Sequence, residues 1–531
     1  KRPQFEILVG GYMFDRFKAF VKRVGAKLGI VKEINQITDH RKVYAEETTY
    51  DRIQLNKQIY NGFVPDWHNI RYTTSNGISK QREMQRLNMG KVVANEMATL
   101  IFNEKCQIDV ATKGLKNNEK SEAEINDPAK EYVNEVLKDN DFYKNFQRYL
   151  EYCYALGGMA VKVFEHNGKI KLSYAVADAM YPLSNDSENL DEMLFIYEEK
   201  KDDKYYTLLE WHEWGKEHTD KGELIDAYII TNELYESDKA NKLGHKVSLN
   251  VLYENLKERT SITGITRPLY VYFKPNTANN KEMQSPLGVS LFDNSHNTLY
   301  SIDYMYDFFL NEFKLGKRRI AVDHSMIKPY IDTDGNTHYG FDTDETVFVP
   351  LNSDDDVQVK DLSVDLRTND IITAINSQLE LLAMQTGFSS GAFTFDGKSV
   401  KTATEVVAEN SKTYRTKNSH EVLVEQGIKD LVKTILEVAT LHNLYSGNLE
   451  VDVTVDFDDS IAEDRQQVYN YYSMAAKDGL IPKKEAIQRI FKVTEKRAEE
   501  WLAEIDAANR AELTGEMYDL LGVPARDMSN E

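Results

Sequence analysis

The sequence predicts an α+β fold in which a strand-rich domain is followed by long helices that flank a small β insert. Residues 160–273 contain short runs of β-branched and aromatic residues, and Asn167-Gly168 between two of these runs is a strong hairpin signal. Residues 294–315 and 368–384 instead place apolar side chains three and four positions apart, which is typical of helices.

The composition indicates a globular protein with more than one core. The chain has 531 residues, of which 41% are hydrophobic and 28% charged, and a domain commonly takes roughly 100–200 residues. No apolar run approaches the roughly 18 residues that cross a bilayer, so we expect no membrane partner. Cys106 and Cys153 are too few for a disulfide framework and lack metal-ligand spacing. We expect two small buried residues in a chain made in a reducing cytoplasm.

The net charge of −21 argues against a protein that recognises DNA sequence through a basic surface. It does not exclude contact with DNA, because affinity for the phosphate backbone grows with each phosphate that is neutralised. An acidic wall would therefore let a duplex slide past without adhering. Acidity that only keeps the protein soluble is at least as good an interpretation of the composition.

Amphipathic helices are expected at residues 14–28, 87–102 and 131–156, before the first of the strand-like runs. The third of these helices ends at Gly157-Gly158, and strand-like runs continue at 205–211, 227–235 and 269–273. These segments together predict an α+β domain that closes near residue 288.

The first long helix has two distinct sides. Its apolar seam indicates a helix that packs against other helices, and consists of Leu299, Ile302, Tyr306, Phe309 and Phe313. The other side carries Asp303, Asp307 and Asn311.

A strand-rich insert follows over residues 317–366, with Asp334-Gly335 as a hairpin turn. The second long helix ends at Gly387, and a loop rich in Gly, Ser and Phe leads to a capping box at residues 402–405. A helix of up to 40 residues then runs to residue 445, a valine-alternating strand covers 451–455, and short helices complete the chain.

Several motifs approach catalytic or metal-binding patterns without matching them. Residues 391–399 resemble a phosphate-binding loop, but five residues instead of four separate its glycines and a helix precedes it. Residues 332–336 lack the glycine spacing of a calcium loop. The acidic runs 354–356 and 458–459 have no Lys or His at motif spacing for magnesium-dependent chemistry. We therefore predict no catalytic residue, no metal site and no cofactor.

Four segments, in this order, resemble portal proteins of tailed bacteriophages, of the type found in siphophages of Gram-positive hosts. They are residues 87–105, Ser285-Pro286-Leu287-Gly288-Val289-Ser290, residues 391–407 and residues 455–461. The resemblance covers most of the chain from about residue 80 to residue 505.

The resemblance implies a non-enzymatic ring, usually of twelve subunits, at one vertex of the capsid. Twelve copies would carry a charge of about −250, which suits a tube with low adhesion for DNA. Residues 1–288 would hold the N-terminal helices and the wing, 289–316 and 367–387 the two stem helices, and 317–366 the clip. Residues 388–401 would be the tunnel loop, 402–458 the long helix with its return to the wing, and 459–531 the helical crown and C-terminal tail.

The resemblance also assigns candidate sites and partners. The tunnel loop would meet double-stranded DNA, independently of sequence, through Phe393, Phe395, Lys398 and Lys401. Asp303 and Asp307 would form an acidic face of the stem, and Tyr330 and Tyr339 would contact partners of the clip. The implied partners are further copies of the chain, the terminase large subunit, a head–tail adaptor, and the major capsid and scaffolding proteins. The implied location is the portal vertex of the virion, after assembly in the host cytoplasm.

Two alternatives remain open from the sequence. One is another structural protein of the phage head, such as a minor capsid protein, which would lack the helix–insert–helix–loop order. The other is a nuclease or ATPase that acts on DNA, suggested by residues 391–399 and the acidic runs.

Overall fold

The computed structural model describes residues 47–505, apart from gaps within that range at 75–76, 114–126, 186–189, 219–222, 241, 284, 318–319, 324–328, 332, 340–347, 352–358, 362–363, 396–410, 458–464, 492, 494–496 and 500. The chain divides into a larger unit, residues 1–397 with 412–457, and a smaller unit, residues 398–411 with 458–531. The expected helix at 14–28 lies outside the described residues.

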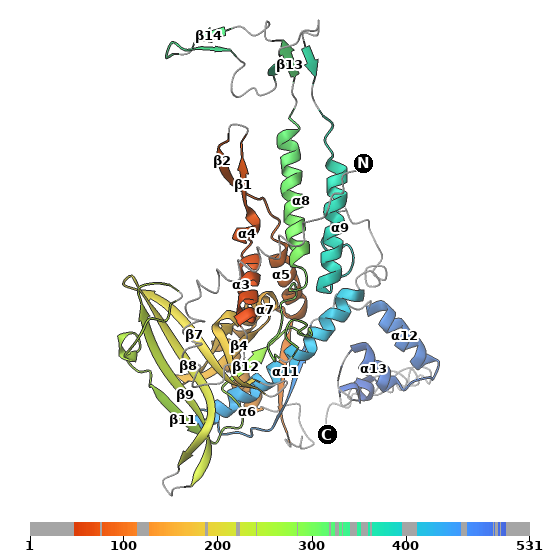
Figure 1. Ribbon diagram of the computed structural model, residues 1–531. Coiled ribbons are helices and arrows are strands. Elements are labelled where there is room, and N and C mark those ends of the chain that lie inside the picture. The colour runs from red at the N-terminus through yellow and green to blue at the C-terminus, as the bar shows by residue number, and fades with distance from the viewer. Residues whose placement is uncertain are drawn as a thin grey trace. The chain divides into compact units, whose positions relative to one another are not determined.

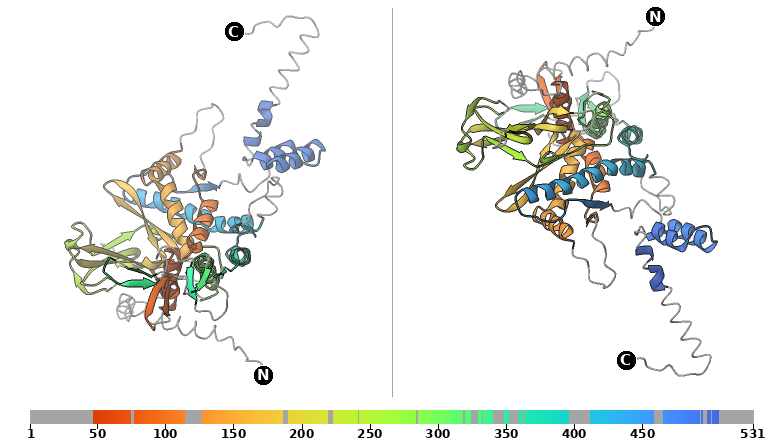
Figure 2. Two further views of the ribbon diagram at one scale, coloured as in Figure 1. Left: turned by 90° about the horizontal axis from the view of Figure 1, so that it is seen from above. Right: turned by 90° about the horizontal axis from the view of Figure 1, so that it is seen from below.

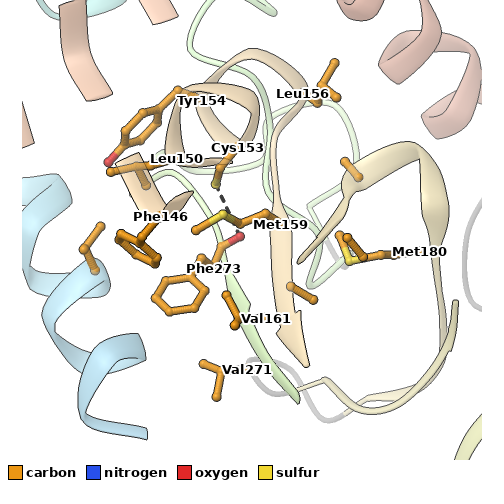
Figure 3. Packing of buried hydrophobic residues seen from close by; sticks show 14 of the residues in the cluster. Phe146, Leu150, Cys153, Tyr154, Leu156, Met159, Val161, Met180, Val271 and Phe273 are labelled. Carbon is orange, nitrogen blue, oxygen red and sulfur yellow. Dashed lines mark hydrogen bonds between the residues drawn. The ribbon is translucent and has the colours of Figure 1, made fainter. Parts of the chain in front are cut away.

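Helix α7 (Phe142–Leu156) occupies the centre of the larger unit and packs against α3 (Glu47–Tyr60), α5 (Met89–Ile101) and α6 (Pro128–Asp139). Its buried face meets the strands that follow it: the rings of Phe146 and Phe273 lie 5.1 Å apart, and the Cys153 thiol donates to the Phe273 carbonyl at 3.4 Å (Figure 3). Cys106 and Cys153 are both buried, as predicted, and neither forms a disulfide bond. Burial raises the pKa of the Cys153 thiol.

Two antiparallel sheets continue from this helical core. The smaller one has the order β12–β4–β5, with β4 at Met159–His166, β5 at Lys169–Val176 and β12 at Tyr270–Phe273. The turn between β4 and β5 is the predicted one: Asn167 and Gly168 both have positive φ, 53° and 75°.

The larger sheet has the order β10–β9–β8–β7–β6, and β11 pairs with β9 as well. Two of its strands, at 204–218 and 224–237, are longer than the sequence runs at 205–211 and 227–235 indicated, and the sheet has six described strands. They are β6 (Met180–Asn185), β7 (Leu190–Lys201), β8 (Lys204–His218), β9 (Leu224–Ser237), β10 (His245–Val247) and β11 (Arg259–Thr263).

A buried ion pair joins the two sheets. Lys162 on β4 donates to Glu210 on β8 at 2.7 Å, and the His212 ring lies 2.5 Å from the same carboxylate oxygen. Burial alone would raise the pKa of Glu210, but Lys162 and His212 outweigh it and hold that pKa well below its usual range.

The rest of the larger unit is mainly helical. Helices α8 (His296–Leu315) and α9 (Thr368–Thr386) lie side by side, and α11 (Ser411–Leu441) is the long blue helix that passes beside β12 (Figures 1 and 2). The remaining elements of this unit are one short helix, α4 (Pro65–His68), and short strands. The strands are β1 (Asn69–Thr73), β2 (Ser79–Glu83), β3 (Gln107–Thr112), β13 (Ile320–Asp323), β14 (Pro329–Ile331), β15 (Thr337–Tyr339), β16 (Phe348–Leu351), β17 (Val359–Asp361) and β18 (Val451–Asp456). In the smaller unit, α12 (Arg465–Lys477) and α13 (Lys483–Phe491) flank a turn at Gly479. None of the described helices has the length and apolar character needed to cross a membrane.

The single helix expected at 131–156 is wrong, because the structure has two helices with a break at Asn140 and Asp141. The Asn140 side chain donates to the Val136 carbonyl and accepts from the backbone N–H of Leu172. Asp141 has a φ of 47°, which no α-helix accommodates. Asn140 thus ends α6 and ties its C-terminal end to β5.

Two glycines fix the segment that leads into α8 against the end of α7. Gly157 ends α7 with a φ of 99°, and a Cβ atom on Gly288 would lie only 2.2 Å from the Gly157 carbonyl oxygen. Next to this contact, the Tyr154 carbonyl accepts from the Ser290 hydroxyl and from the Leu291 backbone. The Ser-Pro-Leu-Gly-Val-Ser segment therefore needs glycine at position 288 for close backbone approach.

We predict that Gly288→Ala lowers the stability of the larger unit by about 1–3 kcal/mol, because the added methyl group forces two packed backbone segments apart. The measurement is the urea midpoint of the intrinsic-fluorescence transition. Gly168→Asn is the control, since no atom lies within 4 Å of a Cβ there and Asn tolerates positive φ. Equal midpoints for the two variants would contradict the close-approach argument.

Candidate functional site

Helices α8 and α9 and the loop after α9 contain most of the predicted site residues. The two helices pack against each other, and Leu299 and Ile302 on α8 and Ile375 and Leu379 on α9 are buried. The pair is also tied at its ends: the Thr298 hydroxyl donates to Gln385 at 2.9 Å, and Arg367 donates to Glu312 at 2.9 Å. Both helices thus follow their predicted ranges closely, and α9 ends at Gly387, with a φ of 86°.

The Asp303 carboxylate is buried and receives two hydrogen bonds from the segment before α5. His68 lies 3.1 Å from one oxygen, and the backbone N–H of Leu87 donates to the other at 2.8 Å. The other ring nitrogen of His68 accepts from the Val64 backbone N–H at 2.8 Å. The ring proton is therefore on Nε2, which donates to Asp303.

The Asp307 carboxylate, one turn further along α8, is held by a fork of hydrogen bonds. Arg82 on β2 donates to both carboxylate oxygens at 2.7 Å, and Gln85 and Asn311 donate as well. Burial would raise the pKa of Asp307, but the Arg82 hydrogen bonds outweigh it and the pKa is lowered.

Residues 64–87, which contain the β1–β2 hairpin, therefore cover the side of α8 that carries Asp303 and Asp307. The sequence places both aspartates on one side of the helix but does not show what covers them. Asp303 and Asp307 are 8% and 4% exposed, so within this chain they act as internal anchors and not as an open acidic face. The hairpin itself was missed, although the sequence between its two strands contains Asn76-Gly77, a recognisable turn signal.

The distal half of α8 leaves large apolar side chains uncovered. Tyr304, Phe308 and Phe313 are 53%, 41% and 46% exposed, and Leu315 is 66% exposed. Phe313 belongs to the predicted apolar seam, whose first two members are buried against the rest of the chain. Exposed aromatic residues in succession along one helix indicate a surface that another protein surface covers.

The loop after α9 places Phe393 and Phe395 in different environments. Phe393 packs against buried Phe388, with ring centres 4.9 Å apart, whereas Phe395 is 58% exposed. Ser389 and Thr413 exchange hydrogen bonds between backbone and hydroxyl groups, at 2.8 and 3.1 Å, and fix the start of the loop on α11. Lys398, Lys401 and the capping box at 402–405 lie outside the described residues.

Tyr330 and Tyr339 lie on the hairpin of β14 and β15, where Tyr330 pairs with His338 and Tyr339 with Pro329. The turn between these strands is the predicted one, with Gly335 at a φ of 83°. A second sheet of this insert has the order β16–β13–β17. The structure thus brings the two predicted tyrosines onto one hairpin, on neighbouring strands.

The described residues contain no group of three or more His, Cys, Asp or Glu side chains placed to hold a metal ion. The acidic runs 354–356 and 458–459 lie outside the described part of the chain, as do the last four residues of the near-miss phosphate loop.

We predict that Asp307→Asn loosens the β1–β2 hairpin. The substitution removes the charge that Arg82 pairs with, and the amide no longer offers two oxygen acceptors to the guanidinium group. The expected cost is about 1–3 kcal/mol, below that of a fully buried pair because the Arg82 side chain is 35% exposed. Amide hydrogen exchange in residues 69–83 should accelerate, while exchange in β4 and β5 stays unchanged.

Glu312→Gln is the control for this prediction, since its partner Arg367 is solvent-exposed and the pair contributes little. The lowered pKa of Asp307 gives the sign of the pH dependence. The interaction contributes fully above the ordinary aspartate pKa and is lost as the pH falls through the lower folded value. Unchanged exchange in the hairpin of Asp307→Asn would show that other contacts hold it.

Comparison with known proteins agrees with this architecture. No curated protein sequence matches the chain. The family model described as "Phage portal protein, SPP1 Gp6-like" matches residues 39–511, which is well over half of the 531 residues. That family is structural and non-enzymatic, which removes the nuclease and ATPase interpretations. The helix–insert–helix–loop order and this match together show that the chain belongs to the SPP1 Gp6-like family of phage portal proteins.

Proposed function

We propose that this chain is the portal subunit that forms a closed ring, of twelve copies, at a single vertex of the capsid. The ring serves as the channel through which double-stranded DNA is packaged and ejected. The family membership supports a portal role in the capsid. The observation that carries the ring is the uncovered apolar half of α8, because one chain alone leaves Tyr304, Phe308 and Phe313 in water.

In a ring, the neighbouring subunit can bury the exposed apolar side chains of α8. Identical subunits that meet through two different surfaces form a closed ring when the rotation between them closes. Each α8 would then pack its outer side against the neighbouring subunit, while its inner side stays on α9. The hairpin anchored by Asp303 and Asp307 keeps the third side of α8 covered within the same subunit.

We further propose that the insert at 317–366 is the clip, which docks the terminase large subunit during packaging and the head–tail adaptor afterwards. Its β14–β15 hairpin carries Tyr330 and Tyr339, and aromatic side chains are common anchors of protein interfaces. The major capsid and scaffolding proteins would contact other faces of the ring. Assembly would take place in the host cytoplasm and end at the portal vertex of the virion.

The loop at 388–401 is proposed as the part of the channel wall that meets DNA. Phe395 is exposed on the described half of the loop, and Lys398 and Lys401 follow it in the sequence. Lysines contact phosphates without reading base sequence, and such contacts weaken as salt rises, so a duplex can move past them.

We predict that Phe308→Asp prevents closed rings, because it places a charge where an aromatic side chain is buried between subunits. A central aromatic residue contributes at least about 2 kcal/mol to an interface, a loss repeated at every contact of the ring. Light scattering and negative-stain micrographs measure the outcome. Phe164→Asp is the matched control, since Phe164 on β4 is equally exposed, at 41%. Intact rings of Phe308→Asp would place the subunit contact elsewhere.

We predict that Lys398→Glu with Lys401→Glu leaves ring assembly intact and reduces the amount of DNA packaged per capsid. The two added acids repel phosphates where two cations attracted them. The control is Lys138→Glu with Lys144→Glu, which changes net charge equally at exposed positions of α6 and α7. Normal DNA content and infectivity of the loop variant would remove this loop from the channel wall.

A further inference from the structure

A groove of about 850 Å3 lies between the C-terminal half of α11 and strand β18. Lys429, Lys433, Glu437 and Leu441 line it at four-residue intervals along one side of α11. Residues 449–454 line it from the strand side, and Gly264, Thr266 and Arg267 contribute from the loop after β11. Its volume falls within the range of sites that bind ligands or peptide segments.

The strand side of the groove is an open sheet edge. β18 pairs only with β3 among the described strands, in antiparallel register with Val453 opposite Val110. The Lys113 N–H donates to the Glu450 carbonyl, so residues 450, 452, 454 and 456 direct their backbone groups at β3. Val451, Val453 and Val455 therefore direct their backbone N–H and C=O groups away from β3, toward the groove.

No described residue pairs with these backbone groups of the three valines. The groove also exposes two apolar side chains, Leu441 at 38% and Leu449 at 42%. The Thr440 hydroxyl is withdrawn from solvent, without a hydrogen-bond partner in the described part of the chain. An open edge beside apolar side chains accepts an added strand, because each unpaired N–H and C=O gains a partner there.

The charged residues that line the groove indicate which kind of added strand it binds. Four lining residues are cationic, Lys113, Arg267, Lys429 and Lys433, against three acidic ones, in a chain where acids outnumber bases 86 to 65. Arg267 pairs with Glu437 at 3.1 Å, Lys429 with Glu425 at 2.8 Å and Lys113 with Asp452 at 3.4 Å. Lys433 has no acidic partner among the described residues, so it remains available to an incoming carboxylate.

We propose that this groove receives an extended, acidic segment of a partner protein, which adds to β18 as a further strand. Backbone hydrogen bonds to Val451, Val453 and Val455 would hold the segment, and alternate side chains would meet Leu441 and Lys433. This binding site does not depend on the proposed ring or its channel, and a chain that failed to form rings would still contain it.

The test uses assembled full-length protein and a fluorescein-labelled peptide, Thr-Asp-Val-Glu-Val-Asp-Val-Glu-Thr, followed by fluorescence anisotropy. A second peptide replaces every acid with lysine. We expect the acidic peptide to bind at least about ten-fold more tightly than the lysine peptide, and Lys433→Glu to weaken its binding by about three- to ten-fold. Lys144→Glu on α7 is the matched control, with an exposed lysine outside the groove, and should bind as the wild type does.

Residue-resolved amide hydrogen exchange shows whether the peptide occupies the strand edge. Saturating acidic peptide should slow exchange at Val451, Val453 and Val455, and leave Asp452 and Thr454 unchanged because they already pair with β3. Equal affinity for the two peptides, or unchanged exchange at the valines, would overturn the proposal. Valine amides already protected in assembled protein without peptide would show that a second copy occupies the edge, which also overturns it.

Discussion

The structure depends on how α8 is fixed at its N-terminal end, because the helix extends well beyond the residues that bury it. Asp293, just before α8, is buried and meets Arg52 at 3.2 Å and Asn56 at 2.6 Å, both from α3. Burial raises the pKa of Asp293, and the positive charge of Arg52 offsets only part of this rise. Together with the contact between Gly157 and Gly288, these interactions give the helix one direction as it leaves the domain, so its uncovered distal half is presented in a defined orientation.

Asp303 and Asp307 continue the same arrangement along the helix. Both carboxylates have hydrogen bonds to side chains and to backbone N–H groups of residues 68–87, so the hairpin has only one position on α8. Buried ion pairs contribute little net stability but penalise every alternative pairing strongly, because an unpaired buried charge is costly. These aspartates therefore determine which side of α8 remains free for a neighbour.

The helices were predictable from the sequence because their signals are local. The three- and four-residue spacing from Leu299 to Phe313 and the glycine after α9 define helix ends without tertiary information. The partners of Asp303 were not predictable, because His68 lies 235 positions away and nothing in a periodic pattern shows what covers a polar side. The break at Asn140 was missed for a similar reason, since the side chain that ends α6 is held by a strand some 30 residues later. Of the loop residues, periodicity could not separate buried-facing Phe393 from exposed Phe395, because a loop has no repeat.

Two uncovered surfaces among the described residues of the larger unit differ in chemistry, and that difference argues for different partners. One side of distal α8 is aromatic and aliphatic, with Tyr304, Phe308 and Leu315 exposed, and permanent interfaces between identical subunits are of this apolar kind. The groove beside β18 combines an open backbone edge with Lys433, three other cations and three acidic residues. The contacts that the groove would make with the proposed segment are mostly polar. Such contacts suit reversible binding, because polar groups return to water at low cost. An apolar strip left open would aggregate, whereas an open polar edge flanked by charges is tolerated by a soluble protein. The α8 surface therefore fits the permanent subunit contact that we propose, and the groove fits the proposed binding of a separate segment.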